Sequence, residues 1–334
     1  MKSRIVLAHG GGGRLTRELV KSVFLPPLAN EALLELADAA VLPFPGGNLA
    51  FTTDAFVVDP PIFPGGDLGY LSVCGTVNDL AMAGARPLAL SWALILEEGA
   101  EERFLRTIAE GAARACREVG VGVVAGDTKV VPRGKGDRAF VTTAGVGVVS
   151  GEALSDRRVK PGDAVIVSGP IGEHGATVLA ARHGLGGDLR SDVAPVWPLV
   201  EHLLQSGVEV HALHDPTRGG VATVCYEVAE RTGLRVELWE TAVPVRPAVK
   251  AVMDILGLDP LYVACEGRFL AFVAESDAER AVGVLRAHPQ GREAQLIGAV
   301  QPRNEGQAPV VLVTAFGPAR PLDLLSGAEL PRIC

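Results

Sequence analysis

The clearest hydrophobic pattern in this chain is a helical one that starts at Asp67. Its apolar positions are Leu68, Leu71, Val73, Val77, Leu80, Ala81 and Gly84. This spacing, and the scarcity of polar residues between these positions, predict a well-buried helix. The stretch before it, from Phe51 to Val58, is short and rich in β-branched and aromatic residues, which predicts a strand. Prolines and glycines at positions 60–66 separate the two elements.

The same criteria predict strands and helices along the rest of the chain. In the first half, the predicted strands are Pro87–Leu96, Val121–Val124 and Ala139–Val149, and the predicted helix is Glu101–Val119, ending at Gly120. In the second half, the predicted strands are 164–167, 234–238, 269–273 and 310–315, the last of the chain, and the predicted helices are 175–182, 198–205, 221–231, 247–257 and 277–287. Helices grouped with mostly non-adjacent strands favour an α+β fold over a doubly wound sheet.

The length of 334 residues favours about two domains. The polar segment Gly151–Asp163 is the predicted boundary between them. We therefore expect a glycine-rich loop and helix (1–40), a first domain (41–150), a second domain (160–315) and a proline-punctuated, mobile tail (317–334) that ends in Cys334.

Composition excludes several classes of protein. A net charge of −8, without a cluster of Lys and Arg among aromatics, argues against nucleic acid as a partner. No apolar run reaches the roughly 18 residues of a membrane span. The N-terminus also has too few apolar residues for a signal peptide, so we expect a cytoplasmic protein. The five cysteines are scattered and form no C-x-x-C pair, which argues against disulfides and structural zinc.

Four polar residues around the predicted helix are candidates for a metal and phosphate site: Asp54, Asp67, Asn78 and Asp79. Acidic groups beside an apolar helix need a compensating cation. Mg²⁺ accepts carboxylates, carbonyls and water when it is held against nucleotide phosphates. For Asp67 the alternative is an N-cap of the helix, and the sequence favours the two roles about equally.

Three other segments carry candidate residues, each with a simpler alternative. The glycines from Gly10 to Gly13 precede a helix and can approach a phosphate, although a surface loop is the commoner outcome. Asp127 and Lys129 follow a predicted strand end, where they could reach a site or belong to an ordinary turn. Asp215 precedes the helix at 221–231, where an N-cap is the alternative.

Eight motifs, taken in order, resemble the HypE family of hydrogenase maturation proteins. They are HGGGG (9–13), TTDAFVVDP (52–60), FPGGDLG (63–69), CGTVNDLAMAGA (74–85), AGDTKVV (125–131), HDPTRGG (214–220), CEGR (265–268) and a terminal PRIC. The resemblance covers essentially the whole chain. It implies the two-domain fold of the aminoimidazole ribonucleotide synthetase superfamily, which also includes selenophosphate synthetase and thiamine monophosphate kinase.

The resemblance implies an activity and roles for individual residues. HypE proteins use ATP to dehydrate a carbamoyl group on the sulfur of their C-terminal cysteine, which gives a thiocyanate that supplies cyanide to the iron of [NiFe] hydrogenase. The implied cofactors are ATP and Mg²⁺. By similarity, the carrier is Cys334, the Mg²⁺ ligands are Asp54, Asp79, Asp127 and Asp215, and the ATP site contains Asp67, Asn78, Gly10, Gly11 and Gly12. Glu266 is the candidate base, and Lys129 is expected beside the developing phosphate or as an aid to deprotonation.

The resemblance also implies partners. Family members form homodimers whose N-terminal domains share a β-barrel, receive the carbamoyl group from HypF and pass cyanide to the HypC–HypD complex. Two alternatives remain open at this stage. One is a sister kinase or cyclo-ligase that acts on a free small molecule. The other is a non-catalytic nucleotide-binding scaffold.

Overall fold

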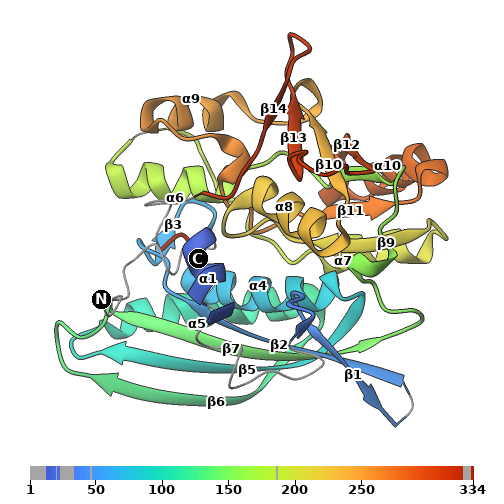
Figure 1. Ribbon diagram of the computed structural model, residues 1–334. Coiled ribbons are helices and arrows are strands. Elements are labelled where there is room, and N and C mark those ends of the chain that lie inside the picture. The colour runs from blue at the N-terminus through green and yellow to red at the C-terminus, as the bar shows by residue number, and fades with distance from the viewer. Residues whose placement is uncertain (1–12, 20, 23–33, 46, 186, 326–331) are drawn as a thin grey trace.

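The computed structural model describes residues 13–19, 21–22, 34–45, 47–185, 187–325 and 332–334. The chain forms two domains, each built on one large sheet (Figure 1). The short helix α1 (Arg14–Leu19) precedes both. Within the described residues, no helix is long and apolar enough to cross a membrane.

The first domain has a five-stranded sheet in the order β1-β2-β7-β5-β6. Its strands are β1 (Ala40–Phe44), β2 (Gly47–Phe56), β5 (Ala85–Glu97), β6 (Gly122–Val131) and β7 (Ala139–Val149). Only β5 and β6 run parallel, and α5 (Glu102–Val119) connects them. A small hairpin of β3 (Ile62–Phe63) and β4 (Gly66–Asp67) leads into α4 (Leu68–Met82). Both α4 and α5 lie on one face of the sheet (Figure 1).

Helix α4 is the structural centre of the molecule. It packs on β2, β5 and β7 on one side, and on α7 and β9 of the second domain on the other. Every residue of α4 except Asp79 is buried, which confirms the helix predicted from Asp67. Helix α5 approaches α4 so closely that a Cβ at Gly69 would lie 1.7 Å from the carbonyl oxygen of Ile108. Only glycine fits at that crossing.

The second domain has a seven-stranded sheet in the order β14-β13-β10-β12-β8-β11-β9. Its strands are β8 (Ala164–Val167), β9 (Val210–His214), β10 (Arg235–Trp239), β11 (Leu270–Val273), β12 (Gln295–Gln301), β13 (Val310–Val313) and β14 (Ala319–Pro321). Its helices are α6 (Glu173–His183), α7 (Trp197–Gln205), α8 (Gly220–Thr232), α9 (Pro247–Leu256) and α10 (Ala278–Ala287). The two sheets and their helices agree with the expected α+β class.

Several sequence predictions are corrected by the strands. The chain has strands β1, β9, β12 and β14 that the sequence pattern did not predict, so the strand near Val310 is not the last. β9 is fully buried although it contains two histidines, because both rings have carboxylate partners. β6 continues to Val131 instead of ending at Val124, so Asp127 lies within a strand and not in a turn.

Candidate functional site

Three of the predicted metal ligands meet where the two domains join. Asp54 lies on β2, Asp79 near the end of α4, and Asp215 directly after β9. The side chains of Asp54 and Asp79 are hydrogen-bonded to each other. The hydroxyl of Thr52 donates to Oδ2 of Asp79 at 2.7 Å. Two domains therefore contribute to one group of carboxylates, which we call the aspartate cluster (Asp54, Asp79 and Asp215).

The pKa of each residue in the aspartate cluster is raised. Burial is the largest cause in every case. Repulsion adds to it: the carboxylates of Asp54 and Asp215 raise the pKa of Asp79. Those of Asp38 and Asp54 help to raise the pKa of Asp215 to about 8. Like charges held together in this way favour the binding of protons or of a cation.

The aspartate cluster fits Mg²⁺ that is shared with phosphates. In the part of the chain that the structure describes, no group of three or more His, Cys, Asp or Glu side chains is arranged to hold a metal ion alone. Mg²⁺ is commonly bound by one or two carboxylates, with water and substrate phosphates completing its shell. Asp54, Asp79 and Asp215 are the residues that would hold it here.

The fourth predicted ligand, Asp127, does not join the cluster within one copy of the chain. It lies on the exposed edge strand β6, where its carboxylate is 2.6 Å from Nζ of Lys129. In register across the sheet, Asp54 is opposite Thr143, Thr143 opposite Trp92, and Trp92 opposite Gly126. Three strand spacings, about 14 Å, therefore separate Asp54 from the Asp127 region. Lys129 is equally remote from the cluster.

Cys334 lies inside the same junction. Its thiol hydrogen-bonds to Glu266. Burial raises the pKa of the thiol, the carboxyl of Glu266 adds to this, and the guanidinium of Arg218 opposes it. The structure therefore brings the predicted carrier together with the predicted base, at the edge of the aspartate cluster. The terminus expected to be mobile is docked at residues 332–334.

Glu266 is held by its backbone from two sides. Its side chain is 2% exposed, and its pKa is raised well above the ordinary value by burial and then by Asp215 and Asp192. The amide of Asn78 donates to the carbonyl of Glu266 at 3.1 Å. The buried carboxyl of Asp192 accepts the N–H groups of Glu266 and Gly267 at 3.4 and 3.3 Å. The backbone of Glu266 is thus held in place by bonds that leave its carboxyl oxygens free for the site.

The residues predicted to contact nucleotide have structural roles in this conformation. Asp67 caps α4 by accepting the N–H groups of Gly69 and Tyr70, both at 2.9 Å. Twelve residues of helix, about 18 Å, separate it from Asp79. Asn78 uses its amide for backbone groups of the second domain, including the N–H of Val196 at 2.8 Å. Gly10, Gly11 and Gly12 lie outside the described residues, and nucleotide contacts by this set remain predictions.

Sequence reasoning missed two residues of the site. Arg218, in the HDPTRGG motif, has its pKa raised first by Cys334 and also by Asp54 and Glu266. A single basic residue after Asp215 was a visible signal for it. His214 bridges Asp38 and Asp156 at 2.7 Å each. Burial alone would lower the pKa of His214, but these two carboxylates raise it well above its ordinary value. The N-cap of α8 is Gly219, so Asp215 does not have the N-cap role that was the alternative for it.

Comparison with known proteins gives the family. Residues 36–149 match the N-terminal domain of the AIR synthase related proteins, and residues 160–311 match their C-terminal domain. Carbamoyl dehydratase HypE of Rhodobacter capsulatus is 49% identical over 99% of this chain and 98% of that protein.

Solved structures agree. A crystal structure of hydrogenase maturation protein HypE in complex with ATP has a TM-score of 0.83 and 45% identity, and the match covers 99% of this chain and 100% of that chain. A HypE–HypF complex has a TM-score of 0.87 and 42% identity, with 92% of this chain and 99% of that chain covered. By sequence, by fold and by the cysteine at its site, this chain belongs to the HypE family of carbamoyl dehydratases within the AIR synthase related proteins.

Proposed function

We propose that this chain uses ATP and Mg²⁺ to convert a carbamoyl group on the sulfur of Cys334 into a thiocyanate. The observation that carries the proposal is that the thiol lies against Glu266 and Arg218, beside the aspartate cluster. The names of the relatives and the ATP complex of one of them support the same reaction.

The reaction requires a better leaving group than the carbamoyl oxygen. In the proposed mechanism this oxygen attacks the γ-phosphorus of ATP, and the bond from that phosphorus to ADP breaks. The carbon–oxygen bond then breaks with phosphate leaving, while the nitrogen forms the C≡N bond and loses both protons, one to Glu266 and the other to the departing phosphate. S-carbamoyl cysteine and ATP give S-cyano cysteine, ADP and phosphate, without any change of oxidation state. Mg²⁺, when bound, offsets the charge of the phosphates.

Glu266 and Arg218 have complementary roles in this mechanism. A carboxylate with a raised pKa is a strong proton acceptor once it is ionised, so Glu266 is suited to take a proton from the nitrogen. Arg218 supplies positive charge close to the sulfur and to Asp54. It therefore stabilises the negative charge that develops on the departing phosphate.

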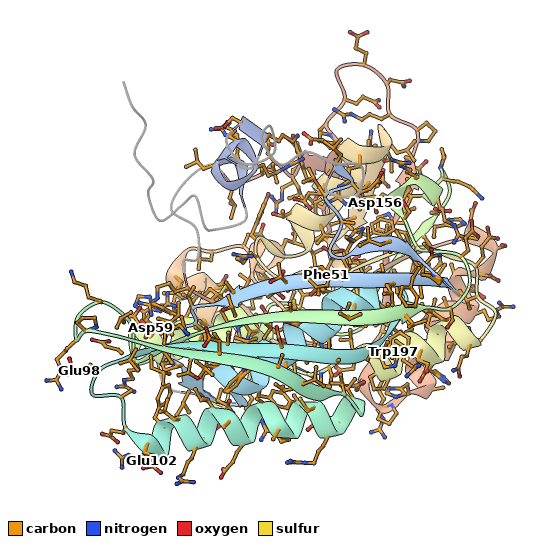
Figure 2. All side chains as sticks on the ribbon, turned by 90° about the horizontal axis from the view of Figure 1, so that it is seen from below. Phe51, Asp59, Glu98, Glu102, Asp156 and Trp197 are labelled. Carbon is orange, nitrogen blue, oxygen red and sulfur yellow. The ribbon has the colours of Figure 1, made fainter. Side chains whose placement is uncertain are left out.

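A homodimer would complete the site. The outer face of the first sheet is not covered by any described helix, and it carries exposed apolar side chains such as Phe51 (Figure 2). β1 pairs with β2 only up to Phe51, so no described strand covers the outer edge of β2 at Asp54. At the opposite end of the sheet, β6 exposes Val124 and Val130, and no strand of the described residues pairs with its outer edge. Exposed apolar edges of this kind are ready-made pairing surfaces.

Pairing β6 of each copy with β2 of the other closes the two sheets into the expected shared barrel. Asp127 and Lys129 of the second copy then lie one strand away from Asp54 of the first. In the dimer, the second copy would thus supply the fourth metal ligand and a cation beside the phosphates. HypF as carbamoyl donor, HypC–HypD as cyanide acceptor and a cytoplasmic location complete the proposal.

Intact mass tests the reaction. Wild type and Cys334→Ala are incubated with the carbamoyl donor system and then with MgATP. We expect wild type to gain one carbamoyl group and then to lose one water, and Cys334→Ala to do neither. If wild type is never modified while ATP is consumed with a free small molecule, the chain is a sister kinase or cyclo-ligase. If ATP is never consumed, it is a scaffold.

A further inference from the structure

The C-terminal residues 332–334 are hydrogen-bonded on one side to the segment that follows β2 and on the other to α6. The N–H of Val57 donates to the main-chain oxygen of Cys334 at 3.2 Å, and the N–H of Asp59 donates to that of Arg332 at 3.1 Å. These two bonds hold residues 332–334 against the segment that directly follows β2. The end of the chain is therefore fixed by main-chain contacts at the point where Cys334 meets the site.

His174, at the start of α6, holds the carbonyl of Ile333, which lies between Arg332 and Cys334. Its Nε2 is 2.8 Å from the oxygen of Ile333, and its Nδ1 is 2.8 Å from Oγ of Ser191. A carbonyl only accepts, so Nε2 carries the proton and Nδ1 of the neutral ring accepts from the Ser191 hydroxyl. The ring is completely buried. Without the tail, its N–H donor would lose its partner.

Arg182, near the other end of α6, ties the tail to the first domain. Its Nη2 donates to the carbonyl of Arg332 at 2.7 Å and to that of Asp59 at 2.7 Å, and its Nε donates to Asp59 at 3.0 Å. One guanidinium thus bridges the main chain after β2 and the main chain of the C-terminal residues. The side chain of Arg332 forms an ion pair with Asp137 at 2.7 Å. The main-chain oxygens of Arg332, Ile333 and Cys334 are therefore all hydrogen-bonded.

We infer that His174 and Arg182 form a latch that holds residues 332–334, which we call the carrier arm, in the site. Both are positioning residues for the thiol of Cys334. This inference rests on the proposed function, because in that function the thiol must leave this position to meet other proteins. The contacts involve backbone oxygens and the buried side chain of Ile333. They therefore fix the arm without touching sulfur, so the group carried on Cys334 can change while the latch stays the same.

The latch is tested by the rate at which iodoacetamide alkylates Cys334, followed by intact mass, with Cys334→Ala as background. Arg182→Lys keeps the charge but cannot bridge both carbonyls. Each lost hydrogen bond shifts the docking equilibrium roughly two- to tenfold, so we expect labelling about tenfold faster than in wild type. The matched control is Arg286→Lys, because Arg286 also donates to a backbone carbonyl, that of Ala294, at 2.8 Å and away from the tail. It should label at the wild-type rate.

Three further variants keep the test decisive if Arg182→Lys folds poorly. Asp137→Asn changes only an exposed loop residue and should speed labelling about twofold. His174→Gln retains an N–H near the position of Nε2 and should label more slowly than His174→Leu. Equal rates for all these variants, wild type and Arg286→Lys would overturn the latch.

The same proteins separate failure of the latch from failure of the proposed function. Labelling needs neither ATP nor a carbamoyl donor, so it reports on the latch even if the chain catalyses another reaction. In carbamoylated protein, Arg182→Lys should lose water on MgATP addition more slowly than wild type, because the thiol is less well positioned even while it is docked, and Arg286→Lys should react at the wild-type rate. A normal rate in Arg182→Lys despite fast labelling would show that docking does not position the thiol for the reaction.

Discussion

The thiol of Cys334 donates a hydrogen bond to the carboxyl group of Glu266. One oxygen of this carboxyl group, Oε1, is buried and has no hydrogen-bond partner among the described residues. A buried acceptor without a partner is costly, and it is usually retained where a substrate or a proton will meet it. Glu266 is therefore oriented toward a group attached to the sulfur of Cys334.

Replacing Glu266 by glutamine should stop the loss of water with little effect on the fold. Glutamine has the same shape, and the bonds that hold this residue involve its backbone. Loss of a general base typically slows a reaction by about 10²- to 10⁴-fold. The measurement is the single-turnover rate of mass loss after MgATP is added to carbamoylated protein. Glu275→Gln, an exposed change, is the control, and equal rates in the two variants would exclude Glu266 as the base.

Arg218→Gln should slow the same step about 100-fold, because the reaction loses a positive charge beside the developing phosphate. Arg218→Lys should fall between this variant and wild type, since lysine keeps the charge but not the planar fork. The comparison is made at saturating ATP, so that weaker nucleotide binding does not enter the rate. If glutamine and lysine were equally slow, geometry rather than charge would be the contribution of Arg218.

The parts of the fold that the sequence predicted are those with a local signal. α4 could be predicted because its apolar spacing is uninterrupted, and α5 because Gly120 ends it in the left-handed conformation that favours glycine. β9 could not, because each of its two histidines is buried against a carboxylate that is remote in sequence, Asp163 for His211 and Asp38 for His214. Its burial depends on tertiary pairing and not on local pattern.

The site shows the same division. Glu266 and Cys334 were predicted from their motifs, but the latch could not be, because His174 and Arg182 bind backbone oxygens of the tail. Backbone acceptors are present at every residue, so the sequence carries no sign of which ones are used. Asp127 was expected at a strand end, and only the strand register shows that one copy of the chain keeps it away from Asp54.

Gly69→Ala should destabilise the first domain. A Cβ there would lie 1.7 Å from the carbonyl oxygen of Ile108, so α4 and α5 would have to move apart. Overpacking of this kind costs about 1–3 kcal/mol of unfolding free energy. Gly283→Ala in α10 is the matched control, because nothing lies within 4 Å of its Cβ position. It should stabilise by about 0.5–1 kcal/mol through helix propensity. Thermal melts of the two variants should move in opposite directions, and parallel shifts would contradict the helix crossing.

Acid should release the tail. Burial lowers the pKa of His174 to about 4 in the docked state. Once the tail leaves, water reaches the ring and its pKa should rise toward the ordinary value of about 6.5. Between these values the undocked protein binds a proton that the docked protein does not. The stabilisation of docking by neutral His174 is therefore complete above about pH 6.5 and is lost as the pH falls toward 4.

The charged residues on the segments that hold the ring are Glu173 and Arg182 on α6, Asp59 after β2 and Arg332 beside Ile333. Glu173 is already paired with two arginines. The measurement is the reaction of Cys334 with a dipyridyl disulfide, normalised to unfolded protein at each pH. The normalised rate should rise by up to about tenfold per pH unit below 6.5. It should be nearly independent of pH in His174→Leu, and a similar slope in that variant would assign the effect to other groups.

Mixing two inactive variants tests whether the site is shared between copies of the chain. In the proposed dimer, Glu266 of one copy works with Lys129 of the other. Lys129→Ala and Glu266→Gln should each be nearly inactive alone. After the two are unfolded, mixed equally and refolded, about half of the dimers are hybrids, and each hybrid has one site with both residues intact. The mixture should therefore recover about a quarter of the wild-type rate of water loss. If Lys129 acted within its own copy, every site in the mixture would lack one of the two residues, and no activity would return. The distance of about 14 Å between β2 and β6 in one copy argues against that arrangement.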